Sequence, residues 1–394
     1  MGTPGNKRVQ IKSLDFIRAV CAIGIVLFHF SWNFFEYGIG GDHLVFAQFA
    51  NGNWGGMFVA MFFMISGALL WHIYGSKISV WRFYVKRWLS IFPMFYLAWA
   101  IVYVYKVQTV YNGVCLWAGP KRLLLYTVFG VDGYFMQLDP TKPGFLVNYY
   151  MLGEWFLGAI VMLYVLFPLL RLLFKNKWSR YIFTLLLAAA YCWNLYSDYF
   201  TISDGTNMIT CVMNFWAGML IMEYWGRRLL DRESPSAAKT RRVTIAAALL
   251  GILIMCLPVS DLISACPGLA EQLSAWPVNL YIFHWEVLVS TLAGACWILV
   301  FMDLGEKIMR IGFLNKIFSA ISRYSFGIFL VHHVLIYELM EQFKGQTMSL
   351  AVSWLAFILV FAIICLVGAL LSAWGSFVSR LVLRLLPDGR TLAK

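Results

Sequence analysis

Long apolar runs recur from one end of this sequence to the other and constrain its fold more than any other feature. The hydrocarbon core of a bilayer is about 30 Å thick, which a helix of about 20 residues crosses. Apolar residues make up 61% of the chain, against roughly 45–50% in an ordinary soluble domain. A soluble domain of this length has too little interior for so much apolar surface. The sequence therefore predicts an all-α integral membrane protein.

The apolar runs predict one membrane domain over residues 1–394, a bundle of about ten transmembrane helices without a soluble accessory domain. The first run is too long for the core of a signal peptide, and no small-x-small cleavage site follows it. Two of the later runs are long enough to tilt or to extend past the lipid. The predicted spans are residues 14–35, 54–74, 85–106, 146–170, 179–196, 207–226, 243–259, 274–302, 317–340 and 348–378.

Positive charge is distributed unequally between the predicted loops. With a cytoplasmic N-terminus, the 31 lysines and arginines fall on the cytoplasmic side or its helix edges except Lys106, Lys121, Arg122, Lys142 and Lys344. Basic loops resist translocation, so both termini are predicted to be cytoplasmic. The net charge of +12 thus follows membrane topology. It forms no basic surface on a soluble domain, which argues against a nucleic-acid partner.

The eight cysteines are scattered along the chain and form no CxxC pair and no paired Cys/His spacing. Most of them fall inside predicted spans, where a free cysteine behaves as a small apolar residue. The sequence accordingly predicts no metal site.

Ionisable residues inside a span are costly and therefore mark candidate functional positions. Arg18 and His29 are eleven residues apart on the first predicted helix. Eleven steps of 100° return the side chain to within about 20° of its starting direction, about 16 Å further along the helix. Asp15, three residues before Arg18, is placed to pair with it. An inner cation suits an anionic donor and a deep imidazole suits proton transfer. Spacing alone also fits an arginine that snorkels to headgroups and a histidine that makes one interhelical hydrogen bond.

Two further histidines, His284 and His332, fall at a depth comparable with His29 in their predicted helices. The three imidazoles either converge in the outer half of the membrane or make unrelated packing contacts, and the sequence does not separate these alternatives. His333 points about 100° away from His332 on the same helix and is expected to be a packing residue.

Five segments carry further motifs, in order along the chain. They are LDFIRAVCAIGIVLFHF (14–30), VAMFFMISGALL (59–70), FYVKRWLSIFPMFYL (83–97), WFLGAIVMLYVLFPLL (155–170) and ISRYSFGIFLVHHVL (321–335). These segments resemble helices of the acyltransferase-3 family, whose members acylate sugars outside the cytoplasm with a cytoplasmic acyl-CoA. The first segment carries an arginine and a histidine separated by ten residues, as the family's first helix does.

The chain departs from the family pattern at two positions. Many members carry a further arginine where this chain has Ser90, and a glutamate where it has Ile160. Glu154 lies before Trp155 and does not occupy the place of that glutamate. No role that depends on the glutamate is carried over.

The resemblance implies a membrane-embedded O-acyltransferase that moves an acyl group from cytoplasmic acyl-CoA, with acetyl-CoA the expected co-substrate, to a hydroxyl of an extracytoplasmic polysaccharide or lipid-linked sugar. His29, as general base or acyl carrier, and Arg18 are the implied catalytic pair. The implied binders of the donor phosphates are Arg82, Lys86 and Arg87. Supporting roles are expected for Asp15, Ser66, His284 and His332. The expected location is the plasma (inner) membrane, with membrane lipids as the surrounding partners.

Two other classes of function remain open on the sequence alone. Intramembrane ionisable residues also mark the pathways of sugar or proton-coupled transporters, although no pair of broken helices in two halves points to inverted repeats. A non-catalytic sensor or scaffold with the same fold is the third class. A helical bundle does not dictate chemistry, so the functional prediction depends on the site residues and the resemblance.

Overall fold

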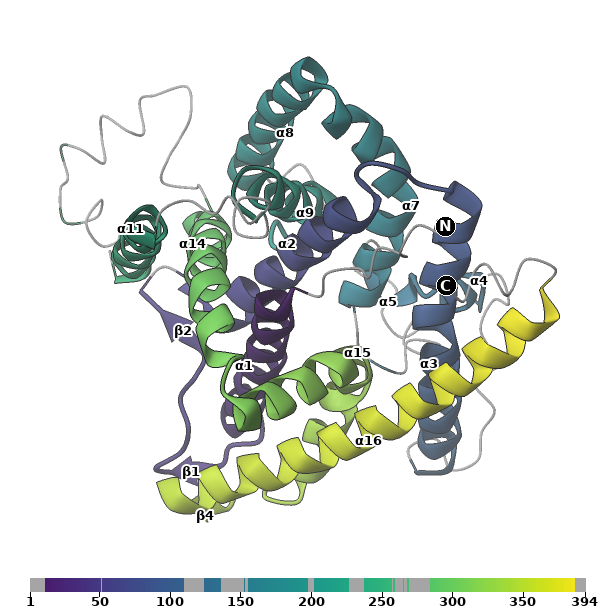
Figure 1. The fold of residues 1–394 in the computed structure, drawn as a ribbon. Coiled ribbons are helices and arrows are strands. Elements are labelled where there is room, and N and C mark those ends of the chain that lie inside the picture. The colour runs from purple at the N-terminus through teal and green to yellow at the C-terminus, as the bar shows by residue number, and fades with distance from the viewer. Residues whose placement is uncertain are drawn as a thin grey trace.

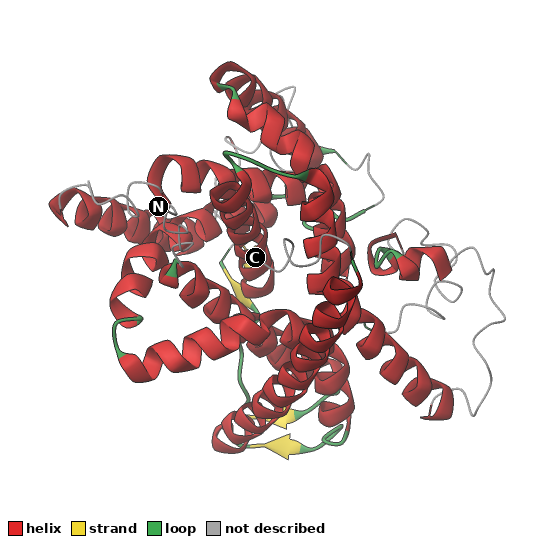
Figure 2. Ribbon diagram, turned by 45° about the vertical axis from the view of Figure 1, so that its right-hand side comes forward, coloured by secondary structure: helices red, strands yellow, loops and turns green. Residues whose placement is uncertain are grey.

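The computed structural model describes most of the chain as helix (Figures 1 and 2). The residues it describes are 11–50, 52–109, 124–135, 152, 155–197, 202–226, 237–256, 258, 265, 268 and 284–386. Glu154 and the first part of the predicted span 274–302 lie outside them.

Seven helices in this described part are long and apolar enough to cross a membrane, which agrees with an all-α membrane protein. Each coincides with a predicted span, although several extend further at one or both ends. They are α1 (Lys12–Glu36), α2 (Trp54–Tyr74), α3 (Val80–Thr109), α7 (Trp155–Lys175), α14 (Trp285–Ile308), α15 (Gly312–Glu341) and α16 (Leu350–Leu385).

The remaining three predicted spans coincide with helices that do not combine the length and the hydropathy needed to cross a membrane. These helices are α8 (Lys177–Tyr196), α9 (Met208–Ile221), which continues into the π-helical turn η4 (Met222–Gly226), and α11 (Ala237–Cys256). A count of ten transmembrane helices and the cytoplasmic placement of both termini therefore stay predictions.

Short elements connect the long helices. The predicted loop 107–145 contains two helices of one turn or so, α4 (Leu124–Val128) and α5 (Asp132–Phe135). Strand β1 (Gly40–Gly41) pairs in parallel with β4 (Thr347–Met348), with Gly40 opposite Thr347. Strand β2 (Gln48–Phe49) pairs antiparallel with β3 (Gly52–Asn53). The first pairing ties the end of α1 to the loop between α15 and α16.

Helix α1 occupies the centre of the bundle and packs against α2, α14 and α15 (Figure 1). Its Ile17, Ala19 and Cys21 are completely buried. Helix α16, 36 residues long, crosses the outside of α15 and reaches α3. At 1.5 Å per residue it measures about 54 Å, longer than the hydrocarbon core is thick. This length agrees with the expectation of a tilted or protruding helix.

Glycines allow two of the helix pairs to approach at backbone distance. A Cβ atom on Gly67 of α2 would collide with the carbonyl oxygen of Phe215 in α9, and one on Gly218 of α9 would collide with that of Met64 in α2. Gly327 of α15 and Gly368 of α16 meet in the same way. Small residues at helix contacts are the usual route to close packing in a membrane.

Candidate functional site

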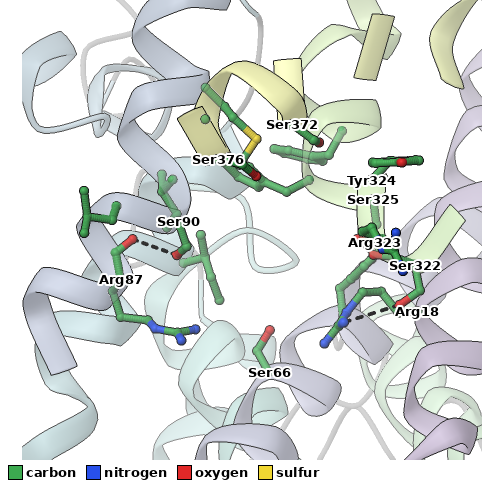
Figure 3. A pocket seen from close by; sticks show the side chains of 18 of the residues that line it. Arg18, Ser66, Arg87, Ser90, Ser322, Arg323, Tyr324, Ser325, Ser372 and Ser376 are labelled. Atoms are coloured by element: carbon green, nitrogen blue, oxygen red, sulfur yellow. Dashed lines mark hydrogen bonds between the residues drawn. The ribbon is translucent and has the colours of Figure 1, made fainter. Parts of the chain in front are cut away.

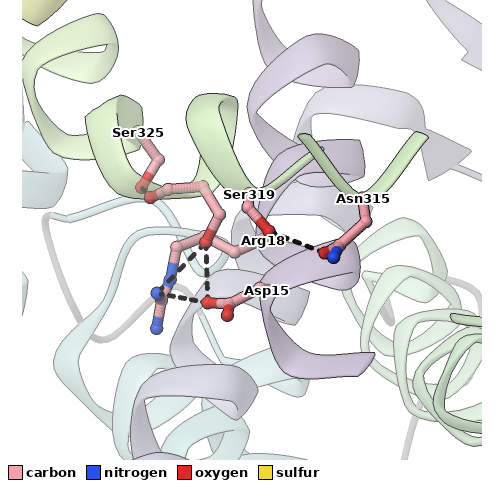
Figure 4. Close-up of polar contacts among 6 residues, drawn as sticks. Asp15, Arg18, Asn315, Ser319 and Ser325 are labelled. Atoms are coloured by element: carbon pink, nitrogen blue, oxygen red, sulfur yellow. Dashed lines mark hydrogen bonds and ion pairs between the residues drawn. The ribbon is translucent and has the colours of Figure 1, made fainter. Parts of the chain in front are cut away.

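The predicted pairing of Arg18 with Asp15 is present near the start of α1 (Figure 4). One guanidinium nitrogen of Arg18 lies 3.6 Å from a carboxylate oxygen of Asp15. Ser322 of α15 joins both: it accepts a hydrogen bond from Arg18 at 3.4 Å and donates one to Asp15 at 3.0 Å. The side chains of Arg18 and Asp15 are 25% and 18% exposed, so the charge of Arg18 is compensated but still accessible.

Three imidazoles meet at a deeper level between α1 and α15. The Nε2 atoms of His29 and His333 are 3.0 Å apart. His332 is 1% exposed, and its Nδ1 lies 2.7 Å from the carbonyl oxygen of Phe329. The ring centroids of His29 and His332 are 5.2 Å apart. From the sequence we expect His333 to be a packing residue only. This expectation is wrong, because His333 makes the hydrogen-bonding contact with His29.

His284 lies away from this cluster. It precedes α14, which begins at Trp285, and its Nδ1 pairs with Asp204 at 3.0 Å. The sequence places His284 deep inside a helix that begins at residue 274, whereas the structure places it at the helix end. The imidazoles that converge are therefore those of His29, His332 and His333.

A cavity of about 800 Å³ lies among α1, α2, α3, α7, α15 and α16. Its polar wall carries arginine, serine and tyrosine side chains, and Figure 3 shows Arg18 and Arg87 on opposite sides with Ser66 between them. The polar lining residues are Arg18, Ser66, Arg87, Ser90, Tyr164, Ser322, Arg323, Tyr324, Ser325, Ser372, Ser376, Ser379 and Arg380.

The described lining contains four arginines and no carboxylate. Asp15 offsets the charge of Arg18, whereas Arg87, Arg323 and Arg380 form no ion pair with another described residue. Arg87 is half-buried, with its guanidinium 5.9 Å from the ring centre of Phe83 and 5.6 Å from that of Tyr164. Its Nε is buried without a hydrogen-bond partner among the described residues. Such a wall suits a ligand with several negative charges.

Only one of the three predicted phosphate-binding residues lines this cavity. Arg87 does, but Arg82 is exposed, and neither Arg82 nor Lys86 belongs to the lining. Ser66 lies in the wall as a supporting residue should. Sequence reasoning missed the contribution of α16, although Ser372, Ser376 and Ser379 follow a helical spacing that places them on one face.

The described lining of the cavity contains no histidine, but two of its apolar residues are neighbours of the histidine cluster. Ile25 lines the cavity and lies one helical turn before His29 on α1. Phe329 also lines it, and its carbonyl oxygen contacts His332. Ile160 is another apolar wall residue. The apolar part of the wall is therefore the part nearest to the histidines.

The histidine cluster is also the set of side chains, within the described ranges, that could share a metal ion. One nitrogen from each of His29, His332 and His333 lies within 4.8 Å of the others. All three are neutral ligands, so an ion held by them alone would keep its full charge in an apolar site, which is unfavourable. The geometry of the three histidines is thus compatible with a metal ion but does not require one.

Fold and site together define a polytopic membrane protein with a cationic cavity, whose wall comes within one helical turn of an imidazole cluster. The chain belongs to the acyltransferase-3 family, since the family model, described as an acyltransferase domain, matches residues 11–374. Nodulation protein 10 of Rhizobium leguminosarum bv. viciae is 27% identical over 234 residues, which cover 55% of this chain and 60% of that relative. The chain thus spans less than two thirds of the length of that protein. No solved structure matches the chain.

Proposed function

We propose that this protein transfers an acyl group from a cytoplasmic acyl-CoA to a hydroxyl of an extracytoplasmic sugar, free, polymeric or lipid-linked. The observation that carries the proposal is the shape and charge of the cavity. Its cationic wall suits the phosphates of coenzyme A, and its apolar end lies one helical turn before His29 on α1. The pantetheine arm of coenzyme A is long and uncharged, which suits the passage between these two ends.

His29 acts as the general base in this proposal. It takes the proton of the acceptor hydroxyl while the hydroxyl oxygen forms a bond to the thioester carbon. The carbon–sulfur bond then breaks, and the released thiolate takes the proton from the imidazolium. The products are the sugar ester and coenzyme A. A thiolate is a good leaving group, so this route needs no strong general acid.

Arg18 holds the donor at the near end of the path in the same proposal. Its pairing with Asp15 and Ser322 fixes the guanidinium at the cavity wall. Arg87, Arg323 and Arg380 take the remaining phosphate charge, in place of the Arg82 and Lys86 that the resemblance implies. The sugar acceptor, the orientation across the plasma membrane and the preference for acetyl-CoA are supported by the family resemblance.

Transfer across a sealed membrane tests the proposal. Purified protein is reconstituted in liposomes, radiolabelled acetyl-CoA is added outside, and envelope glycan is trapped inside. Molecules with their cytoplasmic side outward should move label to the glycan. His29→Ala should lower the rate by about 100- to 10,000-fold, the usual contribution of a general base. His43→Ala is the matched control, because His43 contacts the carbonyl oxygen of Gly41 and lies outside the cluster.

The same experiment separates the alternatives. Release of the trapped glycan, or movement of protons across the membrane, without labelled product would support a transporter. Retention of full activity in His29→Ala would refute the assigned base. A wild type that binds no acetyl-CoA and labels no acceptor would leave a scaffold as the better description.

A further inference from the structure

The histidine that contacts His29 is His333, a residue to which neither the motifs nor the comparisons give a role. We infer that His333 is a positioning residue that accepts a hydrogen bond from Nε2–H of His29 and thereby leaves the His29 lone pair on Nδ1 for the acceptor hydroxyl. This inference rests on the proposed function. It adds a specific tautomer and a specific partner to the general base.

The alignment of α1 with α15 places His333 beside His29. Arg18 contacts Ser322, and His29 contacts His333, so both contacts join residues that are 304 positions apart. The two helices therefore run parallel without slipping over eleven residues, about 16 Å. The spacing Ser322-x10-His333 on α15 matches the spacing Arg18-x10-His29 on α1. This shared register makes the His29–His333 contact a consequence of how the helices pack.

The tautomers follow from the partners of each ring. A neutral imidazole carries one N–H and one lone pair. At 3.0 Å, the contact between the two Nε2 atoms needs a proton on one of them and a lone pair on the other. If His333 donated, the lone pair of His29 at Nε2 would be used up and its Nδ1 would carry a proton. His29 would then have no free lone pair for a substrate, so the productive arrangement has His29 as the donor.

The same contact stabilises the charged form of His29 during turnover. When Nδ1 takes the proton of the acceptor hydroxyl, the ring becomes an imidazolium, and its Nε2–H bond to His333 becomes charge-assisted and stronger. The proton then leaves from Nδ1 to the thiolate of coenzyme A, and His333 keeps its own protons throughout. His332 is held separately, because the carbonyl oxygen of Phe329 can only accept a hydrogen bond from its Nδ1.

Two substitutions of His333 separate positioning from packing. Glutamine places an acceptor oxygen near the position of Nε2 and cannot take up a proton. Leucine fills similar space but cannot accept a hydrogen bond. We expect His333→Leu to lower kcat about 10- to 100-fold, in proportion to a lost charge-assisted hydrogen bond, with KM for acetyl-CoA unchanged. His333→Gln should recover activity to within about fivefold of wild type. Equal loss in both variants, or no loss in His333→Leu, would overturn the inference.

Nitrogen NMR gives a readout that does not depend on turnover. The chain has six histidines, and 15N-histidine labelling with assignment by His29→Gln identifies the signal of His29. The inference expects the Nε2–H tautomer for His29 in wild type and in His333→Gln, and a mixture of tautomers in His333→Leu. A dominant Nδ1–H tautomer of His29 in wild type would overturn it.

Metal analysis of the same preparation tests the alternative that the three histidines bind a metal ion. One equivalent of zinc or another transition metal, lost in His333→Leu, would also overturn the inference, because the metal would occupy the lone pairs that it assigns. An inactive wild type would contradict the proposed function alone, since the NMR result would still decide whether His29 donates to His333.

Discussion

Replacing Arg87 with glutamine tests which cations hold the proposed acyl donor, coenzyme A. The matched control is Arg82→Gln, five residues earlier on α3 and identical in chemistry. Arg87 lines the cavity, whereas Arg82 is exposed and outside the lining. Sequence reasoning gives both residues the same role, and the structure separates them. The two variants therefore distinguish donor binding in the cavity from a general attraction of the donor to positive charge on the cytoplasmic side.

The burial of Arg87 sets the size of the expected effect. Its guanidinium is held against Phe83 and Tyr164. The side chain therefore loses little further conformational entropy when an anion binds. A hydrogen bond to a charged group contributes about 1.5–3 kcal/mol. Since 1.4 kcal/mol is a factor of ten in affinity, Arg87→Gln should raise the Kd for coenzyme A about 10- to 100-fold. Arg380 is exposed and in competition with water, so Arg380→Gln should raise it only a few-fold.

Calorimetric titration of purified protein with coenzyme A measures these affinities without an acceptor. The Arg82→Gln variant should bind within about twofold of wild type, since an exposed charge contributes little. Repeating the titration at higher salt should weaken binding to wild type and reduce the differences between variants. Equal losses in Arg82→Gln and Arg87→Gln would refute the reasoning, because the basic stretch as a whole would then attract the donor.

Two further predictions concern stability and pH. Gly218→Ala should lower the free energy of unfolding by at least about 1–3 kcal/mol, because its Cβ would meet the backbone oxygen of Met64; Gly312→Ala, with nothing within 4 Å of its Cβ, should leave the melting temperature of detergent-solubilised protein unchanged. Burial raises the pKa of Asp132 to about 6, against a partly opposing hydrogen bond from Thr127. The unfolded state therefore ionises first as pH rises, and this group should cost stability progressively between about pH 4 and 6. Asp132→Asn should remove that slope and stabilise the protein above pH 6 by up to about 3 kcal/mol, and an unchanged slope in urea unfolding would contradict this assignment.

The positions of the long helices follow from the sequence because the bilayer imposes length and hydropathy on each of them. The run at 54–74 gives α2 with the same bounds, and that at 348–378 gives most of α16. Helix ends are less constrained, since polar residues continue a helix beyond the lipid at little cost. The prediction for 274–302 shows the difficulty: α14 begins at Trp285 and ends at Ile308. This shift is enough to place His284 at a helix end.

The site is harder to derive, because periodicity gives directions within one helix but not the direction of its neighbour. Asp15 and Arg18 are close in sequence, so their pairing could be predicted. His332 and His333 point about 100° apart, yet both rings lie against His29, with centroids 5.2 and 4.0 Å away. Because α1 lies between the directions in which these two side chains point, its His29 contacts both rings. The contribution of Arg323 and Arg380 likewise depends on how α15 and α16 pack, which no local pattern contains.

The parallel alignment of α1 and α15 connects the two ends of the site mechanically. Arg18 and Ser322 meet at the cavity wall, and His29 and His333 meet eleven residues further along both helices. A slide of one helix by a single residue, about 1.5 Å, would break both contacts together. Packed helix surfaces resist small continuous displacements, because their side chains interdigitate. In the proposed function, a donor held by Arg18 therefore meets His29 and His333 at a position along the helices that is already fixed. The distance that its acyl arm must span is then set by the fold before any ligand binds.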